Sequence, residues 1–360
     1  MKKLLFIVGT RPEAIKLYSP IQKCRENIGF DTQVCLTNQH TDLILPFLRE
    51  LGIHIDFFLA FENLNHSLHG IIAEQIQELE KVLLKVSPDL VIVQGDTSSA
   101  FSGALAAHYL KIPVAHIEAG LRTEKLFSPW PEEAHRRMID QLTSYFFVPS
   151  LLAKEALLKE NIPSQSIWVV GNSSIDALNL FKEKIAEPCD RVKRSIVVTI
   201  HRRENQGCVL EGICSALTTV AYSFDDVEIV FFLHPANEKI VKTSLGGREN
   251  IHLLPPVDHL TFLKFMMQST FIITDSGGIQ EEAPALGKPI LLVRDTTERP
   301  EGIQVGTARL IGTSPDQIVA HCVELLCNPK TLLAMTKIHH PYGYGDSGTQ
   351  ITEVLEKILL

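Results

Sequence analysis

The stretch HIEAGLRTEKLFSPWPEEAHRRM, residues 116–138, concentrates four carboxylates: Glu118, Glu124, Glu132 and Glu133. Carboxylates on either side of a substrate can take up and return protons, which is general acid–base catalysis. The stretch also reads as a helix start, because proline and acidic residues are favoured in a first helical turn. By residue type alone, Glu132 and Glu133 are better explained as charges that stabilise this helix start.

Asp96 stands at a comparable place in QGDTSSA (94–100), directly after the apolar run DLVIVQ (89–94). Glu118 likewise follows the apolar run PVAHI (113–117). If both runs form neighbouring parallel strands, both carboxylates enter the same cleft at the carboxyl ends of the strands. An N-cap role explains Asp96 equally simply, since Asp, Ser and Thr are common at helix starts.

Two glycine-containing turns that follow apolar runs have the features of anion sites. In GTRPEAIK (9–16), Arg11 and Lys16 flank a helix start that has Pro12 at its expected first position. In SGGIQEE (276–282), backbone N–H groups at the start of a helix would face a phosphate, those of Ser276, Gly277 and Gly278. Both are as consistent with ordinary glycine turns. Neither fits GxGxxG or a Walker loop, so NAD binding and ATP hydrolysis are not expected.

The second turn continues into further charged residues. Glu282 lies on the helix after the turn, where a carboxylate can hold a ribose diol, although a helix dipole alone would favour it there. Arg294 and Arg299 add cations in RDTTERPE (294–301). In HRREN, His201 and two arginines follow another apolar run, which suits a negatively charged leaving group or, more simply, a solvated basic loop.

No metal or cofactor is expected. His66 and His69 have the HxxH spacing, but no third ligand is evident. The seven cysteines are an odd number, are scattered, and include no CxxC pair, so the sequence predicts neither a disulfide framework nor a zinc site. This pattern is typical of a reducing cytosol and favours a cytoplasmic protein.

Length and charge restrict the function class. The chain has 360 residues, which suggests about two domains. Its formal net charge of -8 argues against a general nucleic-acid binder. The N-terminus MKKLLFIVGT has too short an apolar run for a signal peptide, and GTRPE replaces a cleavage site. No apolar stretch approaches the roughly 20 residues that span a bilayer, so no membrane association is expected.

The strands and helices that position these side chains can be predicted from short apolar runs, each followed by a helical pattern. In the first half the runs are LLFIV (4–8), DLVIVQ (89–94), PVAHI (113–117) and SYFFV (144–148). In the second half they are SIVVTI (195–200), VEIVFFL (227–233), NIHLL (250–254), TFIITD (270–275) and KPILLV (288–293). Continuous apolar runs predict strands that helices cover on both faces, and the alternation predicts two doubly wound α/β halves. The boundary is expected near residues 170–190, with ligands in the cleft between the halves.

Seven motifs give the chain a resemblance to one family: GTRPEAIK, QGDT, HIEAGLRT, SPWPEEAHR, HRREN, TDSGGIQEEAPALGKPILLVRDTTERPEG and HPYGYGDSG. From residue 9 to about 348 the chain resembles the non-hydrolysing UDP-N-acetylglucosamine 2-epimerases. The resemblance implies a glycosyltransferase-B-like α/β fold of two Rossmann-like domains with the active site in the cleft between them. It places an acid–base domain at 1–172, a UDP-binding domain at 173–347, and a C-terminal helix, 348–360, that packs back on the first domain.

The family interconverts UDP-GlcNAc and UDP-ManNAc without NAD, for use in polysaccharide biosynthesis. The proton at C2 is not next to a carbonyl, so the family's route eliminates UDP to give 2-acetamidoglucal and then adds UDP back. Such a route needs acid–base groups on both sides of the sugar and positive charge around UDP. Family members are usually dimers, so the resemblance implies a homodimer that binds a UDP-N-acetylhexosamine.

Carried over by motif, the residues fall into two sets. The resemblance implies that Asp96, Glu118 and Glu132 are acid–base groups and that His201 is the fourth active-site group. The positions that match the nucleotide-sugar site are Arg11, Lys16, Ser276, Gly277, Gly278 and Arg299. Glu282 matches the ribose ligand, and Val257 and Phe262 fall where the family surrounds the uracil.

Two positions depart from the family pattern. Ile200 precedes His201 where the family usually has glycine. Gln39 and His40 match, but Thr41 stands where bacterial members often carry an arginine of the activating UDP-GlcNAc site. The resemblance therefore does not extend to allosteric activation.

Three other functions remain open. A hydrolysing 2-epimerase would release free ManNAc and UDP. A retaining UDP-sugar glycosyltransferase of the same fold would need an acceptor and no carboxylates around C2. A non-catalytic UDP-sugar sensor would bind the same ligand without turnover.

Overall fold

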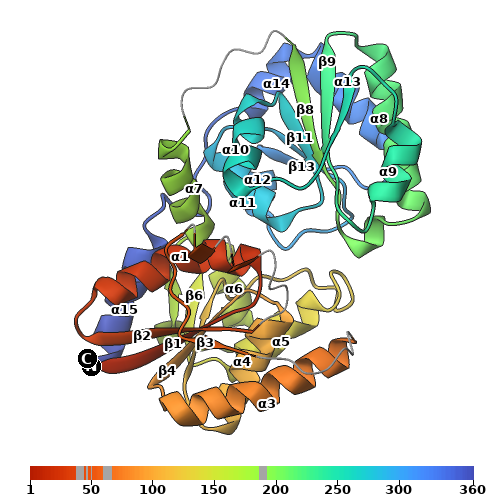
Figure 1. The fold of residues 1–360 in the computed structure, drawn as a ribbon. Helices are drawn as coiled ribbons and strands as arrows, with labels where there is room; N and C mark the ends of the chain where they lie inside the picture. Colours follow the sequence, from red (N-terminus) through yellow and green to blue (C-terminus); the bar gives the residue numbers. More distant parts are fainter. Residues whose placement is uncertain (38–43, 46–47, 50, 60–66, 186–192) are drawn as a thin grey trace. The chain divides into compact units, whose positions relative to one another are not determined.

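Two compact units make up the computed structural model, which describes residues 1–37, 44–45, 48–49, 51–59, 67–185 and 193–360 (Figure 1). Unit 1 comprises Met1–Leu178 and Tyr342–Leu360, and unit 2 comprises Asn179–Pro341. The first boundary falls inside helix α7 (Ser173–Glu183). The chain returns to unit 1 at Tyr342, shortly before the expected start of the last helix.

Unit 1 contains a seven-stranded sheet among its described residues, in the order β3-β2-β1-β4-β5-β6-β7. Its strands are β1 (Lys2–Val8), β2 (Phe30–Leu36), β3 (Phe57–Phe58), β4 (Leu90–Gln94), β5 (Val114–Ile117), β6 (Tyr145–Val148) and β7 (Ile167–Val169). All recorded pairings are parallel. The strand order reverses between β1 and β4, which is where ligands bind in doubly wound sheets.

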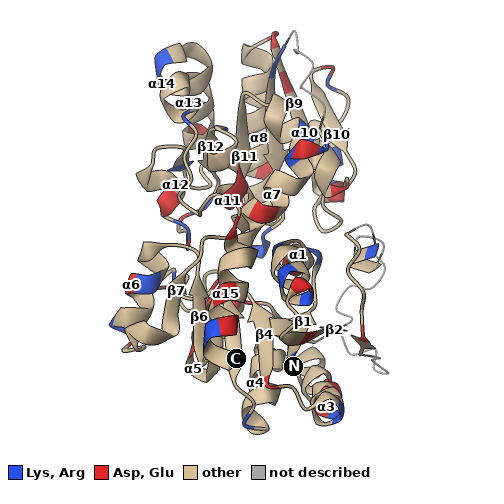
Figure 2. Ribbon diagram, turned by 90° about the vertical axis from the view of Figure 1, so that its left-hand side faces the viewer, with Lys and Arg blue, Asp and Glu red and all other residues tan. Residues whose placement is uncertain are grey.

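Helices cover both faces of this sheet (Figure 1). They are α1 (Arg11–Glu26), α3 (Leu68–Val86), α4 (Ser98–Tyr109), α5 (Glu132–Leu142), α6 (Leu151–Lys159) and α15 (Ser347–Leu359), with a 3-10 turn η1 (Ser164–Ser166). All five residues of β4 are buried, as a continuous apolar run in a parallel sheet predicts. Acidic and basic positions are interspersed along α1 and α3 (Figure 2).

Unit 2 repeats the architecture, with a six-stranded parallel sheet among its described residues in the order β10-β9-β8-β11-β12-β13. Its strands are β8 (Arg194–Thr199), β9 (Val227–Phe232), β10 (Ile251–Leu254), β11 (Phe271–Thr274), β12 (Ile290–Leu292) and β13 (Ala308–Leu310). Its helices are η2 (Arg203–Asn205), α8 (Cys208–Ser223), α9 (Glu238–Leu245), α10 (His259–Gln268), α11 (Gly277–Ala285), α12 (Glu301–Gln304), α13 (Pro315–Cys327) and α14 (Pro329–Met335). Side chains of α8, α9 and α13 share one apolar core with this sheet.

The last helix, α15, packs against α1 within unit 1. Gly348 lies so close to Ser19 that a Cβ there would stand 2.1 Å from the Ser19 hydroxyl oxygen. The Asp176 carboxylate accepts hydrogen bonds from Ser19 Oγ at 2.7 Å and from the Gly348 N–H at 2.9 Å. The C-terminal residues are therefore an integral part of the first unit.

No single helix in the described ranges is long and apolar enough to cross a membrane. The pair α13 and α14 has the required length and composition only when the two are taken together, and they are bent by 98°. Ile318 and Cys322 of α13 and Met335 of α14 are buried in the core of unit 2.

Candidate active site

Asp96 and Glu118 emerge from neighbouring strands. β4 pairs with β5 in parallel, with Gln94 opposite Ile117, and the Gly95 N–H donates to the Ile117 carbonyl at 3.0 Å. This pairing confirms that the two strands are neighbours, as the prediction of a shared site required. Both carboxylates stand at the carboxyl edge of the sheet, next to the strand-order reversal.

Donors from three different elements and loops contact the buried carboxylate of Glu118 within the described part of the chain. Lys16 Nζ lies 2.6 Å from its Oε1, Asn172 Nδ2 donates to the same oxygen at 3.1 Å, and Gln94 Nε2 donates to Oε2. Glu118 has φ +69°, a left-handed backbone that non-glycine residues rarely adopt. A neighbouring ammonium and two amide donors hold the Glu118 carboxylate in a fixed orientation at the end of β5.

Asp96 is fixed from helix α5. The Arg136 guanidinium donates to Asp96 Oδ2 from Nε at 3.2 Å and from a terminal nitrogen. His135 Nδ1 lies 3.1 Å from the Asp96 backbone carbonyl. Burial lowers the pKa of His135, so its ring favours the neutral form and donates to this carbonyl from Nδ1.

Glu132 is the first residue of α5 and is partly exposed. It precedes Arg136 by four positions, so both lie on the same face of the helix. Since Arg136 binds Asp96, this face is turned toward the strand ends that carry the other carboxylates. Pro131 precedes the helix as its N-cap, one residue earlier than the sequence predicted.

Glu133 lies in the first turn of α5, as the sequence predicted, but it does more than stabilise the helix start. Its side chain is fully buried, whereas ordinary helix-start charges stay solvated. It accepts from Arg136 at 2.6 Å, from Arg137 at 2.9 Å and from the Thr123 N–H at 3.1 Å. Glu133 thus holds the loop before α5 against the helix.

A second buried network supports these strand ends. His116 lies on β5, with Nδ1 2.7 Å from Asp140 and Nε2 2.7 Å from the Gly95 carbonyl. Arg122 donates to the other oxygen of Asp140 at 2.7 Å. Burial alone would raise the pKa of Asp140, but His116 and Arg122 together hold it below its ordinary value. The network fixes the backbone beside Asp96.

Helix α1 begins beside the same strand ends. Thr10 is its N-cap and Arg11 its first residue, so Pro12 takes the second position instead of the expected first. Gly9 has no room for a side chain, because a Cβ would lie 1.9 Å from Ser99 Oγ. Arg11 is exposed, whereas Lys16 is buried against Glu118.

Glu13, in the same motif, was not identified from sequence. It is buried, and its Oε1 accepts from Thr97 Oγ1 at 2.8 Å, beside Asp96. Its Oε2 has no hydrogen-bond partner in the described part of the chain. Burial raises the pKa of Glu13 to about 7, although hydrogen bonds from Thr10 and Thr97 lower it.

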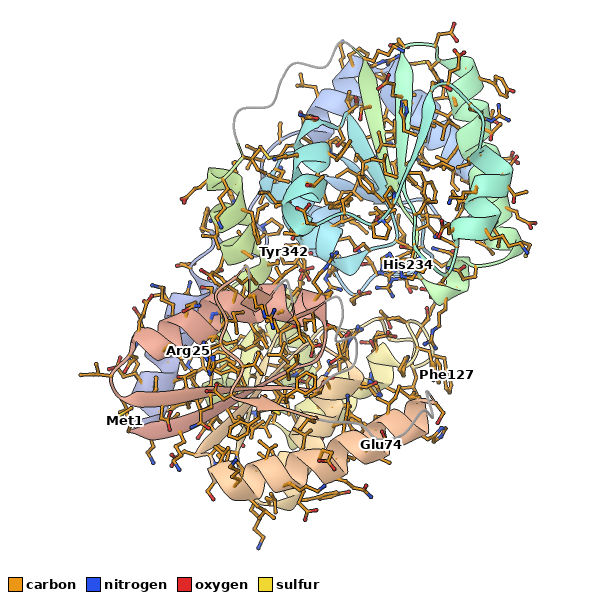
Figure 3. All side chains as sticks on the ribbon, in the orientation of Figure 1. Met1, Arg25, Glu74, Phe127, His234 and Tyr342 are labelled. Atoms are coloured by element: carbon orange, nitrogen blue, oxygen red, sulfur yellow. The ribbon has the colours of Figure 1, made fainter. Side chains whose placement is uncertain are left out.

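In unit 2, His201 and the α11 turn also follow neighbouring strands. β8 pairs with β11, with Thr199 opposite Thr274. His201 is partly exposed, and its Nδ1 lies 2.9 Å from the buried carboxylate of Asp275. His234, which follows β9 and is labelled in Figure 3, has its ring 6.2 Å from that of His201.

Helix α11 begins at Gly277, with Ser276 as its N-cap, so its first N–H groups point out of the helix end. A Cβ on Gly277 would lie 2.8 Å from the Arg299 guanidinium, whereas one on Gly278 would meet nothing within 4 Å. The helix end is therefore compact on the Arg299 side and open at Gly278. This geometry suits an anion.

Buried carboxylates hold the arginines beside α11. Arg299 Nε lies 2.6 Å from Glu281, and a second Arg299 nitrogen donates to Glu298. Arg294 reaches the other oxygen of Glu298 at 2.8 Å, and Arg202 lies 3.4 Å from Glu298. Burial lowers the pKa of Arg294. Glu298 therefore collects three arginines near the helix end.

The remaining predicted binding residues lie around the same unit. Glu282, in the second turn of α11, is buried with Oε1 3.4 Å from His259 Nε2. Phe262 on α10 stacks edge-to-face on Phe232, with ring centroids 5.0 Å apart. Val257 is half-buried in the loop before α10.

Among the described residues, no group of three His, Cys, Asp or Glu side chains could hold a metal ion. His66, and Gln39, His40 and Thr41 of the activating-site motif, lie outside the described residues. The predictions on those positions stay predictions.

A family model described as UDP-N-acetylglucosamine 2-epimerase matches residues 22–356. The chain belongs to the UDP-N-acetylglucosamine 2-epimerase family. The UDP-N-acetylglucosamine 2-epimerase of Salmonella typhimurium is 41% identical over 98% of each chain.

Solved structures agree with this family assignment. UDP-GlcNAc 2-epimerase from Neisseria meningitidis, bound to UDP-GlcNAc, has a TM-score of 0.95 and 39% identity, covering 99% of this chain and 100% of that one. The enzyme from Methanocaldococcus jannaschii, in complex with UDP-GlcNAc and UDP, has a TM-score of 0.88 and 35% identity over 99% of each chain. A glycosyltransferase of kitacinnamycin, at 13% identity and a TM-score of 0.63, shares the fold. The glycosyltransferase-B-like fold class is thereby confirmed.

Several residues that organise this epimerase-family site were missed from sequence. Gln94, Asn172, Arg136 and Glu298 each contact a predicted site residue. Asp275 carried a usable signal, because it follows an apolar run as Asp96 does. Asn172 carried none, since its contact with Glu118 joins positions 54 residues apart.

Proposed function

We propose that the chain reversibly epimerises UDP-GlcNAc and UDP-ManNAc at C2, by eliminating UDP to 2-acetamidoglucal and adding it back. The observation that carries the proposal is the gathering of Asp96, Glu118 and the start of α5 at one sheet edge, where Arg136 links Asp96 to the helix of Glu132. A reaction that removes and returns a proton at C2 from opposite faces needs more than one acid–base group.

In the elimination, a carboxylate takes the C2 proton while the C2–H electrons form the C1=C2 double bond. The C1–O bond breaks, and its electron pair leaves with the diphosphate of UDP. Re-addition forms the C1–O bond again as a carboxyl group delivers a proton to the opposite face of C2. We assign these transfers to Asp96, Glu118 and Glu132 without allocating faces.

UDP must stay bound between the two steps. We propose that Arg11, His201, Arg299 and the α11 N-terminus hold its diphosphate, that Glu282 binds the ribose, and that Val257 and Phe262 adjoin the uracil. The open space at Gly278 and the arginines held by Glu298 support an anion there. Lys16 acts in this proposal through Glu118, its ion-pair partner, as well as by its charge.

We further propose a cytoplasmic homodimer that supplies UDP-ManNAc for polysaccharide biosynthesis. The support is the family resemblance, together with free thiols at Cys24, Cys35 and Cys322 in the described ranges.

Product analysis tests the reaction type. Purified protein incubated with UDP-GlcNAc and no acceptor should give a stable mixture of UDP-GlcNAc and UDP-ManNAc by proton and phosphorus NMR. Steady accumulation of free UDP with ManNAc would instead show the hydrolysing reaction. Turnover that requires an added acceptor would show a glycosyltransferase, and binding without any turnover would show a sensor.

A further inference from the structure

Asp275 and His201 form a pair at the carboxyl ends of β11 and β8. Because Thr199 lies opposite Thr274 in these parallel strands, the residues that follow them emerge side by side. Asp275 is fully buried, while the His201 side chain keeps 41% of its surface exposed. The pair therefore joins a fixed carboxylate to a ring that solvent or a ligand can reach.

The Asp275 carboxylate is surrounded by groups that can only donate. The backbone nitrogen of His201 lies 3.1 Å from both oxygens, and Oδ2 also accepts from the backbone N–H of Arg202 and from Asn205 Nδ2, each at 2.9 Å. Burial alone would raise the pKa of Asp275, but the bonds from His201, Arg202 and Asn205 hold it below its ordinary value. An ionised acceptor facing His201 Nδ1 requires a proton on that nitrogen.

Among the described residues, His234 and Arg202 lie near the His201 ring and offer it no acceptor. His234 Nδ1 accepts from the Ala236 N–H at 3.3 Å. Burial, and then the positive charge of His201, lower the pKa of His234, so its ring favours the neutral form. The Arg202 guanidinium can only donate, and its Nε donates to the Asp275 carbonyl at 2.8 Å.

We propose that Asp275 is a positioning residue that fixes His201 as the Nδ1–H tautomer, with Nε2 presented to the diphosphate of the UDP-sugar. The role of Nε2 rests on the proposed function, because only a leaving diphosphate needs it. When Nε2 carries a proton, the imidazolium donates a hydrogen bond to the departing diphosphate, and Asp275 stabilises the ring charge from the other side. The carboxylate–imidazole pair of serine proteases works by the same physical logic.

Nitrogen NMR tests the tautomer without any turnover. The full-length protein is labelled with ¹⁵N-histidine, and His201 is assigned from the signals lost in His201→Gln. At a pH where the ring is neutral, the two-bond ¹H–¹⁵N pattern should be that of the Nδ1–H form, and Asp275→Asn should shift it toward Nε2–H. An Nε2–H ring in the unmutated protein overturns the proposal, whatever the enzyme turns out to catalyse.

Kinetic measurements distinguish a role of Asp275 in positioning the His201 ring from a role in holding the loop that carries His201. Asp275→Asn should lower kcat about a hundredfold with little change in KM, the scale of a lost acid–base contribution. The double variant His201→Asn/Asp275→Asn should be no slower than His201→Asn alone, because Asp275 acts through the ring. Additive losses in the double variant would contradict this.

Asn205→Ala is the matched control, since it removes a donor to the same carboxylate but leaves the His201 contact. Its kcat should stay within about threefold of the unmutated value. A loss as large as that of Asp275→Asn would show that Asp275 only holds the loop and would overturn the proposal. If Asp275→Asn does not fold, the tautomer of the unmutated protein still decides the matter.

Discussion

Glu118 illustrates how neighbouring donors fix the position of a single carboxylate. Lys16, Gln94 and Asn172 all donate to it, so its carboxylate is held in one orientation. Asp96 is similarly bound by Arg136. Their strand-end positions could be predicted from sequence, because apolar runs followed by an acid mark the edge of a parallel sheet. Their partners could not, because those contacts join distant positions.

At this scale, Asp96→Asn, Glu118→Gln and Glu132→Gln should each lower kcat by about a hundredfold or more, the usual loss for an acid–base group. The amides keep the size of the side chains but cannot take up a proton at neutral pH. Glu124→Gln, an exposed residue of the same loop, is the control and should leave kcat unchanged. Normal turnover in Glu132→Gln would remove that residue from the mechanism.

Glu133→Gln should act on stability. Its carboxylate is buried between Arg136 and Arg137, and the amide would remove the negative charge that both guanidiniums contact there. Breaking a buried ion pair costs about 3 kcal/mol, so the midpoint of thermal unfolding should fall by several degrees. An unfolding midpoint unchanged from that of Glu124→Gln would show that the buried pair is dispensable. The spacing of Glu133 to both arginines was visible in the sequence, but its burial was not.

At the scale of elements, strands with a continuous apolar run were predictable, whereas the seven-residue β2, which begins FDTQ, was missed although it is as long as β1. β4 and β8 follow from their apolar runs, whereas β3, β7 and β13 have only two or three residues and no periodic signal. Helix starts were predicted to within one residue, as Pro12 and Pro131 show. Helix packing, which buries Glu13 between the starts of α1 and α4, depends on the whole fold.

Glu13 should make stability depend on pH. Its pKa is raised to about 7 from the model-peptide value of 4.5, so the folded state binds its proton more tightly than the unfolded state does. Its contribution is therefore fully present below about pH 4.5 and is lost as the pH rises through about 7, by up to about 3 kcal/mol. Unfolding midpoints measured from pH 5 to 8 should fall less steeply in Glu13→Gln. The same slope in both proteins would contradict this.

The N-terminus of α11 can be tested with two neighbouring glycines. Gly278→Ala should leave the unfolding midpoint unchanged or slightly higher, because alanine favours helices by up to about 1 kcal/mol. It should nevertheless weaken UDP binding at least about tenfold, since the methyl group enters the open space. Gly277→Ala should instead lower stability, because it displaces Arg299 from Glu281 and Glu298. Calorimetric titration with UDP gives the affinities, and normal UDP binding by Gly278→Ala would exclude an anion site there.

At the scale of the whole molecule, two doubly wound units were predictable from the alternation of strands and helices. The structure divides them between Leu178 and Asn179, inside helix α7. The reason that the chain returns to unit 1 is visible only in the structure, where Asp176, which also accepts from Ser19, binds the first N–H groups of α15.

The central claim is that a proton leaves C2 of the sugar and returns from the opposite face. The direct measurement is incubation of the protein with UDP-GlcNAc alone in D2O, followed by NMR of both nucleotide sugars. The account predicts deuterium at C2 of UDP-ManNAc, and in time at C2 of the recovered UDP-GlcNAc, with none elsewhere on the ring. UDP-ManNAc that forms with protium retained at C2 would contradict it.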